Sequence, residues 1–164
     1  MLLTSADILA TYAHAVRRFG VARGMDRIAL RRALATARAV VTTLREEHPR
    51  SRAVEPVAIF VAFAATPEVF AEYGRLLMPS LLALAQAAKQ GLVLEVPAEA
   101  LEREAIALTF HAERGKPYDL ADLFEMVRAG LTTPPPKPPR RQNPARRPVG
   151  GRGRARAGAQ QGMW

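Results

Sequence analysis

Apolar and polar residues alternate at helical intervals along most of the first 131 residues. The earliest run begins behind Thr4 and Asp7, whose spacing is that of a capping box, and its apolar positions recur every three or four residues until Gly20. A threonine oxygen accepts from free backbone amides at a helix start, and an acid there suits the positive end of the helix dipole. The pattern predicts a helix over residues 5–19.

Two further helices are predicted before residue 66. Asp26 caps one whose apolar stripe ends before His48-Pro49, because proline disfavours α geometry in the residue that precedes it. Glu55-Pro56 opens the next, in which residues 57–63 are apolar all round the axis. A helix with no polar side belongs in the centre of a domain.

Start and stop residues divide the rest of the pattern. Thr66-Pro67-Glu68 predicts a helix that reaches Lys89, with a break or kink near Met78-Pro79, because an internal proline removes one backbone hydrogen bond. Residues 92–96 look extended but have no partner strand in the sequence.

Two last helices are predicted, one from Pro97 to Gly115 and one from the cap Asp119 to Gly130. The chain is therefore predicted to be all-α, a compact bundle of six to seven helices joined by short loops.

The pattern ends at Thr132, and the composition changes with it. The chain has 24 Lys+Arg and 15 Asp+Glu, and residues 133–164 hold eight of these cations and no acid. A proline-rich, strongly charged segment of low hydrophobicity cannot offset the entropy of ordering. We therefore predict an all-α domain over residues 1–131 and a disordered basic tail over residues 132–164.

Several function classes are excluded or disfavoured by composition. The absence of cysteine excludes disulfides, cysteine zinc sites and thiol nucleophiles. The three histidines are scattered without metal-ligand spacing, so we predict no metal and no cofactor. The longest apolar run, residues 57–65, is too short to span a bilayer, and the first residues do not resemble a secretory signal. These features predict a cytoplasmic protein without a membrane partner.

The clearest chemical feature is the charge of the tail. Cations on a flexible chain neutralise phosphates and release counterions, which predicts sequence-independent binding to DNA or RNA. Arginines set among glycines resemble RGG-type RNA-binding segments, although only Trp164 could stack on a base. The predicted binding residues are Lys137, Arg140, Arg141, Arg146, Arg147, Arg152, Arg154 and Arg156.

Two other interpretations of the tail stay open. Only three of the 24 cations are lysine, so the arginines can reflect a GC-rich genome, and a proline-rich segment can bind a protein partner. Arg27, Arg31 and Arg38 on the second helix either extend the nucleic-acid surface or form an ordinary solvated face.

A characteristic order of elements is formed by residues 8–14, by Arg18-Phe19-Gly20, by the Gly-x-x-Asp…Leu-x-x-Ala-Leu-like stretch 24–35, and by residues 91–94 with the helices behind them. This order bears a resemblance to the Fic/Doc family, the death-on-curing toxins of toxin–antitoxin systems and their nucleotidyl-transferase relatives. The resemblance covers most of residues 1–130, and its motifs are individually weak. It implies a helical fold and transfer of a nucleotidyl or phosphoryl group to a protein hydroxyl.

The family's catalytic loop, His-Pro-Phe-x-Asp/Glu-Gly-Asn-x-x-Arg, would fall on residues 66–75. This stretch keeps Pro67, Phe70, Glu72, Gly74 and Arg75, but Thr66 stands where the histidine base should be, the asparagine is missing and the spacing differs. The resemblance thus implies a degenerate motif, inactive in the standard reaction; without it, residues 66–75 are only a well-capped helix start.

Three functions follow from these observations. The preferred one is a non-catalytic, degenerate Fic/Doc-like protein that binds nucleic acid through its tail. The first alternative is a toxin-like transferase in which Glu72 and Arg75 hold metal and phosphate. The second is an assembly or adaptor protein of a phage or plasmid, whose tail binds a protein.

Overall fold

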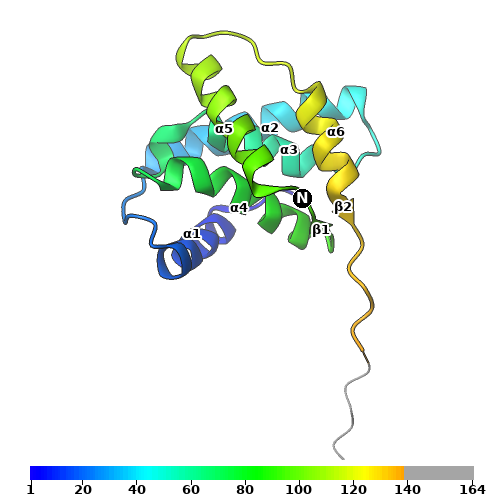
Figure 1. Cartoon of the computed structure of the whole chain (residues 1–164). Coiled ribbons are helices and arrows are strands. Elements are labelled where there is room, and N and C mark those ends of the chain that lie inside the picture. The colour runs from blue at the N-terminus through cyan, green and yellow to red at the C-terminus, as the bar shows by residue number, and fades with distance from the viewer. Residues whose placement is uncertain (139–164) are drawn as a thin grey trace, which may run out of the picture. The chain divides into compact units, whose positions relative to one another are not determined.

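A computed structural model of the chain describes residues 1–138, which form six α-helices and two very short strands (Figure 1). This confirms the predicted all-α class. The elements in chain order are α1 (Ser5–Phe19), α2 (Arg27–Glu47), α3 (Val54–Ala64), the 3₁₀ turn η1 (Pro67–Val69), α4 (Gly74–Lys89), β1 (Val93–Leu94), α5 (Ala98–Glu113), α6 (Ala121–Gly130) and β2 (Leu131–Thr132).

Helix α3 is the centre of the bundle. All of its residues, from Val54 to Ala64, are buried, and it packs against α2, α4, α5 and α6. The prediction of a central helix without a polar side is confirmed. Helix α1 packs against α4, and each of the outer helices contributes one apolar side to the core, as amphipathic helices do.

Two apolar clusters lie against α3. Ile59 and Phe63 belong to the first, which includes Ile8 of α1, Leu30 of α2 and Leu82 of α4. Val57 and Phe60 belong to the second, together with Leu44 at the end of α2, Leu108 of α5 and Leu123 of α6. Helix α3 therefore connects the α1 side of the bundle with the α5–α6 side.

The predicted caps of α1 and α2 are confirmed. The Thr4 backbone N–H donates to Asp7 Oδ2 at 2.7 Å, and the Asp7 N–H donates to Thr4 Oγ1 at 3.2 Å. Asp26 Oδ1 accepts from the backbone of Ile28 and Ala29 at 2.8 and 3.0 Å. These bonds satisfy amides that a helix start otherwise leaves without partners.

The predicted helix start at Thr66-Pro67 is wrong. Only the short turn η1 forms there, the Thr66 side chain makes no capping bond, and α4 begins at Gly74. The backbone after the turn pairs instead with the α1–α2 connection: Asp26 N–H donates to Val69 O at 3.0 Å, and Ala71 N–H donates to Gly24 O at 3.3 Å. This tertiary pairing holds the segment out of helical geometry.

A break at Met78-Pro79 does not occur, because α4 is continuous from Gly74 to Lys89; the alternative of a kink there stays a prediction. Proline lacks a backbone N–H, so the helix loses the bond from position 79 to the Arg75 carbonyl. Both Met78 and Pro79 are buried.

The extended segment 92–96 has a partner strand, contrary to the prediction. Val93 pairs with Thr132 and Leu94 with Leu131 in an antiparallel β1–β2 ladder, and Glu95 N–H donates to Gly130 O at 2.8 Å. The compact unit extends from Met1 to Pro134, so the predicted domain boundary between residues 131 and 132 falls inside β2.

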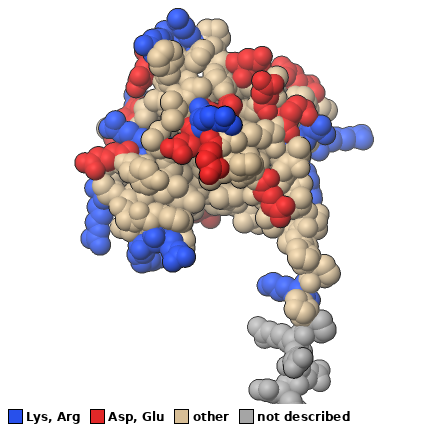
Figure 2. Space-filling model, in the orientation of Figure 1, with Lys and Arg blue, Asp and Glu red and all other residues tan. Residues whose placement is uncertain are grey.

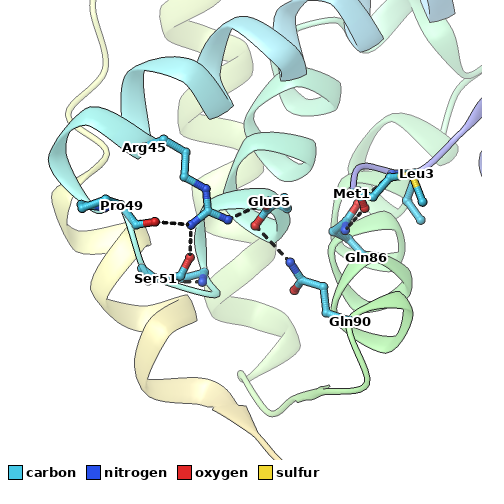
Figure 3. A network of polar contacts seen from close by, with 9 residues as sticks. Met1, Leu3, Arg45, Pro49, Ser51, Glu55, Gln86 and Gln90 are labelled. Atoms are coloured by element: carbon cyan, nitrogen blue, oxygen red, sulfur yellow. Dashed lines mark hydrogen bonds and ion pairs between the residues drawn. The ribbon is translucent and has the colours of Figure 1, made fainter.

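Two groups of polar contacts are built on buried side chains, Gln86 and Glu55 (Figure 3). The fully buried Gln86 accepts from Leu3 N–H at 2.8 Å and donates to Met1 O at 3.0 Å, which anchors the first residues to α4. Arg45 donates to Glu55 Oε1 at 2.5 Å, and Gln90 donates to Glu55 Oε2 at 3.0 Å. The buried carboxylate thus has a partner on each oxygen, as burial requires.

Candidate nucleic-acid interface

One predicted tail cation, Lys137, lies in the described part of the chain and is exposed. The other seven predicted binding residues lie outside the described residues, as does most of the predicted disordered tail. They are Arg140, Arg141, Arg146, Arg147, Arg152, Arg154 and Arg156.

The three arginines that were predicted to extend the tail's surface are all exposed on α2. Arg27, Arg31 and Arg38 are separated by four and seven residues, so they lie on one side of the helix. Within residues 1–138, none of them has a carboxylate partner at ion-pair distance. Their guanidinium groups are therefore available to an anion in solution.

Further exposed arginines lie near Arg27 in the chain, and sequence reasoning missed them. Arg17 and Arg18 lie in the last turn of α1, Arg23 lies in the connection to α2, and all three are exposed. Lys and Arg side chains gather over the α1 part of the molecule in Figure 2. The signal in the sequence is the cluster of cations on both sides of the Gly20 stop.

The candidate residues at 66–75 lie in the connection between α3 and α4 and in the first turn of α4, which begins at Gly74. Thr66, Phe70 and Gly74 are buried, whereas Glu72 and Arg75 are exposed. Glu72 has a φ of 42°, in the region that side chains other than glycine rarely adopt.

Within residues 66–75, three of these five residues contact one another. A Cβ on Gly74 would lie 3.1 Å from the Phe70 Cβ, and Arg75 Nε donates to Phe70 O at 3.3 Å. The Phe70 ring stacks between Tyr12 and Phe63, with ring centroids 5.6 and 5.9 Å away. The structure thus gives Phe70 a place in the apolar core.

A pocket of about 330 Å³ lies between the end of α2 and the start of α6. Its walls include three carboxylates, those of Glu47, Asp119 and Glu125, and the side chains of His48 and Phe124. The rings of His48 and Phe124 stack with centroids 4.0 Å apart. Acidic side chains are conspicuous over this side of the bundle in Figure 2.

The electrostatics of this acidic pocket disfavour phosphate. Asp119 Oδ1 accepts from Ala121 N–H at 2.9 Å, and Arg128 donates to Glu125 and lowers its pKa. Burial, followed by the hydrogen bond to Glu104, raises the pKa of the Tyr118 hydroxyl, which therefore stays protonated. The pocket is lined by three carboxylates and by no lysine or arginine, so the basic residues around α1 and α2 are the better candidate for nucleic acid.

Comparison of the chain with protein-family models, curated proteins and solved structures finds no match. Within the described residues, no helix is long and apolar enough to cross a membrane.

Proposed function

We propose that this protein is a non-catalytic nucleic-acid-binding protein of the cytoplasm, a degenerate Fic/Doc-like domain whose arginine-rich tail contacts phosphates. The observation that carries the proposal is the charge of residues 133–164, which contain eight cations and no acid. Their charge is not balanced locally, so phosphate groups are the natural counterions.

The mechanism is release of counterions from the nucleic acid. The logarithm of the binding constant falls linearly with the logarithm of the salt concentration. Each neutralised phosphate steepens this slope by about 0.9 for duplex DNA and by about 0.7 for single strands. If all eight cations engage a duplex, the slope reaches about −7. Binding of this kind is independent of sequence, and DNA and RNA both fit it.

The test is fluorescence anisotropy with labelled oligonucleotides at two salt concentrations. Three proteins are compared: the full chain, the full chain with the eight tail cations changed to glutamine, and residues 1–134. The truncation ends after Pro134 because Thr132 pairs with Val93. We expect both altered proteins to lose most of the affinity and most of the salt dependence.

A matched control is Arg103→Gln/Lys116→Gln, which removes two exposed cations from α5 and the loop behind it. This variant should bind like the unaltered chain. Equal and weak binding by all four proteins would overturn the proposal. A protein partner that the full chain retains after nuclease treatment, and loses with the tail, would favour the adaptor alternative instead.

A further inference from the structure

The connection between α1 and α2 is held in a defined conformation. The Tyr12 hydroxyl donates to Ala22 O at 3.1 Å and accepts from Gly24 N–H at 2.7 Å. Val21 is buried, and the Asp26 backbone is bonded to Val69. Residues 17–32, called the α1–α2 junction below, therefore present their exposed side chains from a fixed backbone.

The junction has a positive charge even when its acidic neighbours are counted. Its cations are Arg17, Arg18, Arg23, Arg27, Arg31 and Arg32. The nearby acids are Asp26, Glu68 and Glu72, of which Asp26 caps α2 and Glu68 pairs with Arg32. The remaining excess is the charge complement of a phosphate backbone.

An aromatic ring is exposed among these cations. Phe19 is the last residue of α1, directly after Arg17 and Arg18 in the chain, and it is 48% exposed. Its ring packs edge-on against His14, with centroids 6.2 Å apart, so one edge is held by the helix. The tail lacks such a ring among its arginines, since its only aromatic residue is Trp164.

We propose that the α1–α2 junction is a second nucleic-acid contact, in which Phe19 stacks on an unpaired base while the arginines bind the adjoining phosphates. This inference rests on the proposed function and adds a substrate class to it, single-stranded nucleic acid. A duplex offers phosphates to the arginines but keeps its bases stacked, so the ring gains nothing from it. Cations combined with an exposed aromatic ring are the usual composition of single-strand binding surfaces.

An anionic lipid surface is the other partner that arginines and exposed apolar groups can suit. A helix that lies in a lipid surface needs a broad apolar face to insert. Here the apolar faces are used in the core, since Ile8 and Ala15 of α1 and Leu30 of α2 are buried. Phe19 and Ile28 alone do not replace such a face, which favours nucleic acid.

The experiment uses the full chain and anisotropy with a labelled 20-nucleotide thymidine strand and a 20-base-pair duplex. Phe19→Ala should weaken single-strand binding at least about fivefold and leave duplex binding unchanged. Phe110→Ala is the matched control, because Phe110 is 49% exposed but lies on α5 under the Arg114 guanidinium. Arg17→Gln/Arg18→Gln/Arg23→Gln should weaken binding to both probes.

The outcomes separate the two proposals. If the full chain binds neither probe, the proposed function and this inference both fail. If it binds both probes and Phe19→Ala behaves like Phe110→Ala, only this inference fails. Equal losses on both probes, or loss of binding to phosphatidylserine vesicles with no change on the oligonucleotides, would also overturn it. Because Phe19 is exposed, we expect the variant to keep the thermal stability of the unaltered chain.

Discussion

The Gln86 side-chain oxygen accepts a hydrogen bond from the Leu3 backbone N–H at 2.8 Å, and Gln86 is completely buried. Changing Gln86 to leucine keeps the volume but leaves the buried Leu3 N–H without a partner, whereas Met1 is 87% exposed and its carbonyl can bond to water. Each unsatisfied buried group costs about 1–3 kcal/mol. We expect urea denaturation to show a loss in this range, whereas Ala88→Ser, at an exposed position of α4, should change stability little.

The effects of substitutions at Arg45 and Glu55 on stability should be strongly coupled. Arg45→Met leaves the Glu55 carboxylate, whose side chain is only 11% exposed, without its cation. Removing one partner of a buried pair costs about 3 kcal/mol or more, whereas replacing both by apolar residues is often nearly neutral. A double-mutant cycle with Glu55→Leu measures this. Additive losses in the double variant would contradict the expected coupling.

Asp7 should make stability depend on acid pH. The hydrogen bond from Lys89, followed by those from Thr4, lowers the pKa of this carboxyl from 3.8 to about 2. A pKa that is lower in the folded state gives a stabilisation that is complete above about pH 4 and is lost as the pH falls through 2. Between pH 4 and pH 2, the free energy of unfolding should therefore fall less steeply in Asp7→Asn and in Lys89→Met than in the unaltered chain. Identical slopes in all three proteins would argue against this role.

Gly130 has no room for a side chain. An added Cβ would lie 2.6 Å from Val96 Cγ2 and 2.8 Å from the Glu95 carbonyl oxygen. Relief requires the Glu95 backbone to move, and that backbone donates to Gly130 O in the β1–β2 region. Gly130→Ala should cost about 1–3 kcal/mol, as overpacking does. Gly20→Asn is the control, since Gly20 faces open space and asparagine tolerates its left-handed geometry.

The sequence predicted those parts of the fold that depend on local chemistry. The caps at Thr4 and Asp26 and the central position of α3 follow from residues close together in the chain, and the structure confirms them. The predictions that proved wrong concern features that depend on residues far apart in the chain. The start of α4 depends on backbone pairing with Gly24 and Asp26, and β1 depends on residues that follow α6.

The candidate site shows the same division. The tail's charge is visible in its composition. The spacing of Arg27, Arg31 and Arg38 in the sequence likewise places them on one side of a helix. The exposure of Phe19 could not be predicted, because its spacing in α1 is that of an apolar core position and only the packing shows that half of it faces solvent. The Fic/Doc resemblance and the roles that it assigns to residues 66–75 stay predictions.

The burial of α3 has a consequence for how the protein opens. Its backbone amides are surrounded by α2, α4, α5 and α6, so solvent reaches them only when those helices separate. Deuterium should therefore enter the peptide 54–64 at the rate of global unfolding, whereas the ends of the outer helices exchange by local fraying. Mass spectrometry of that one peptide would then report the stability of the whole bundle, with or without nucleic acid.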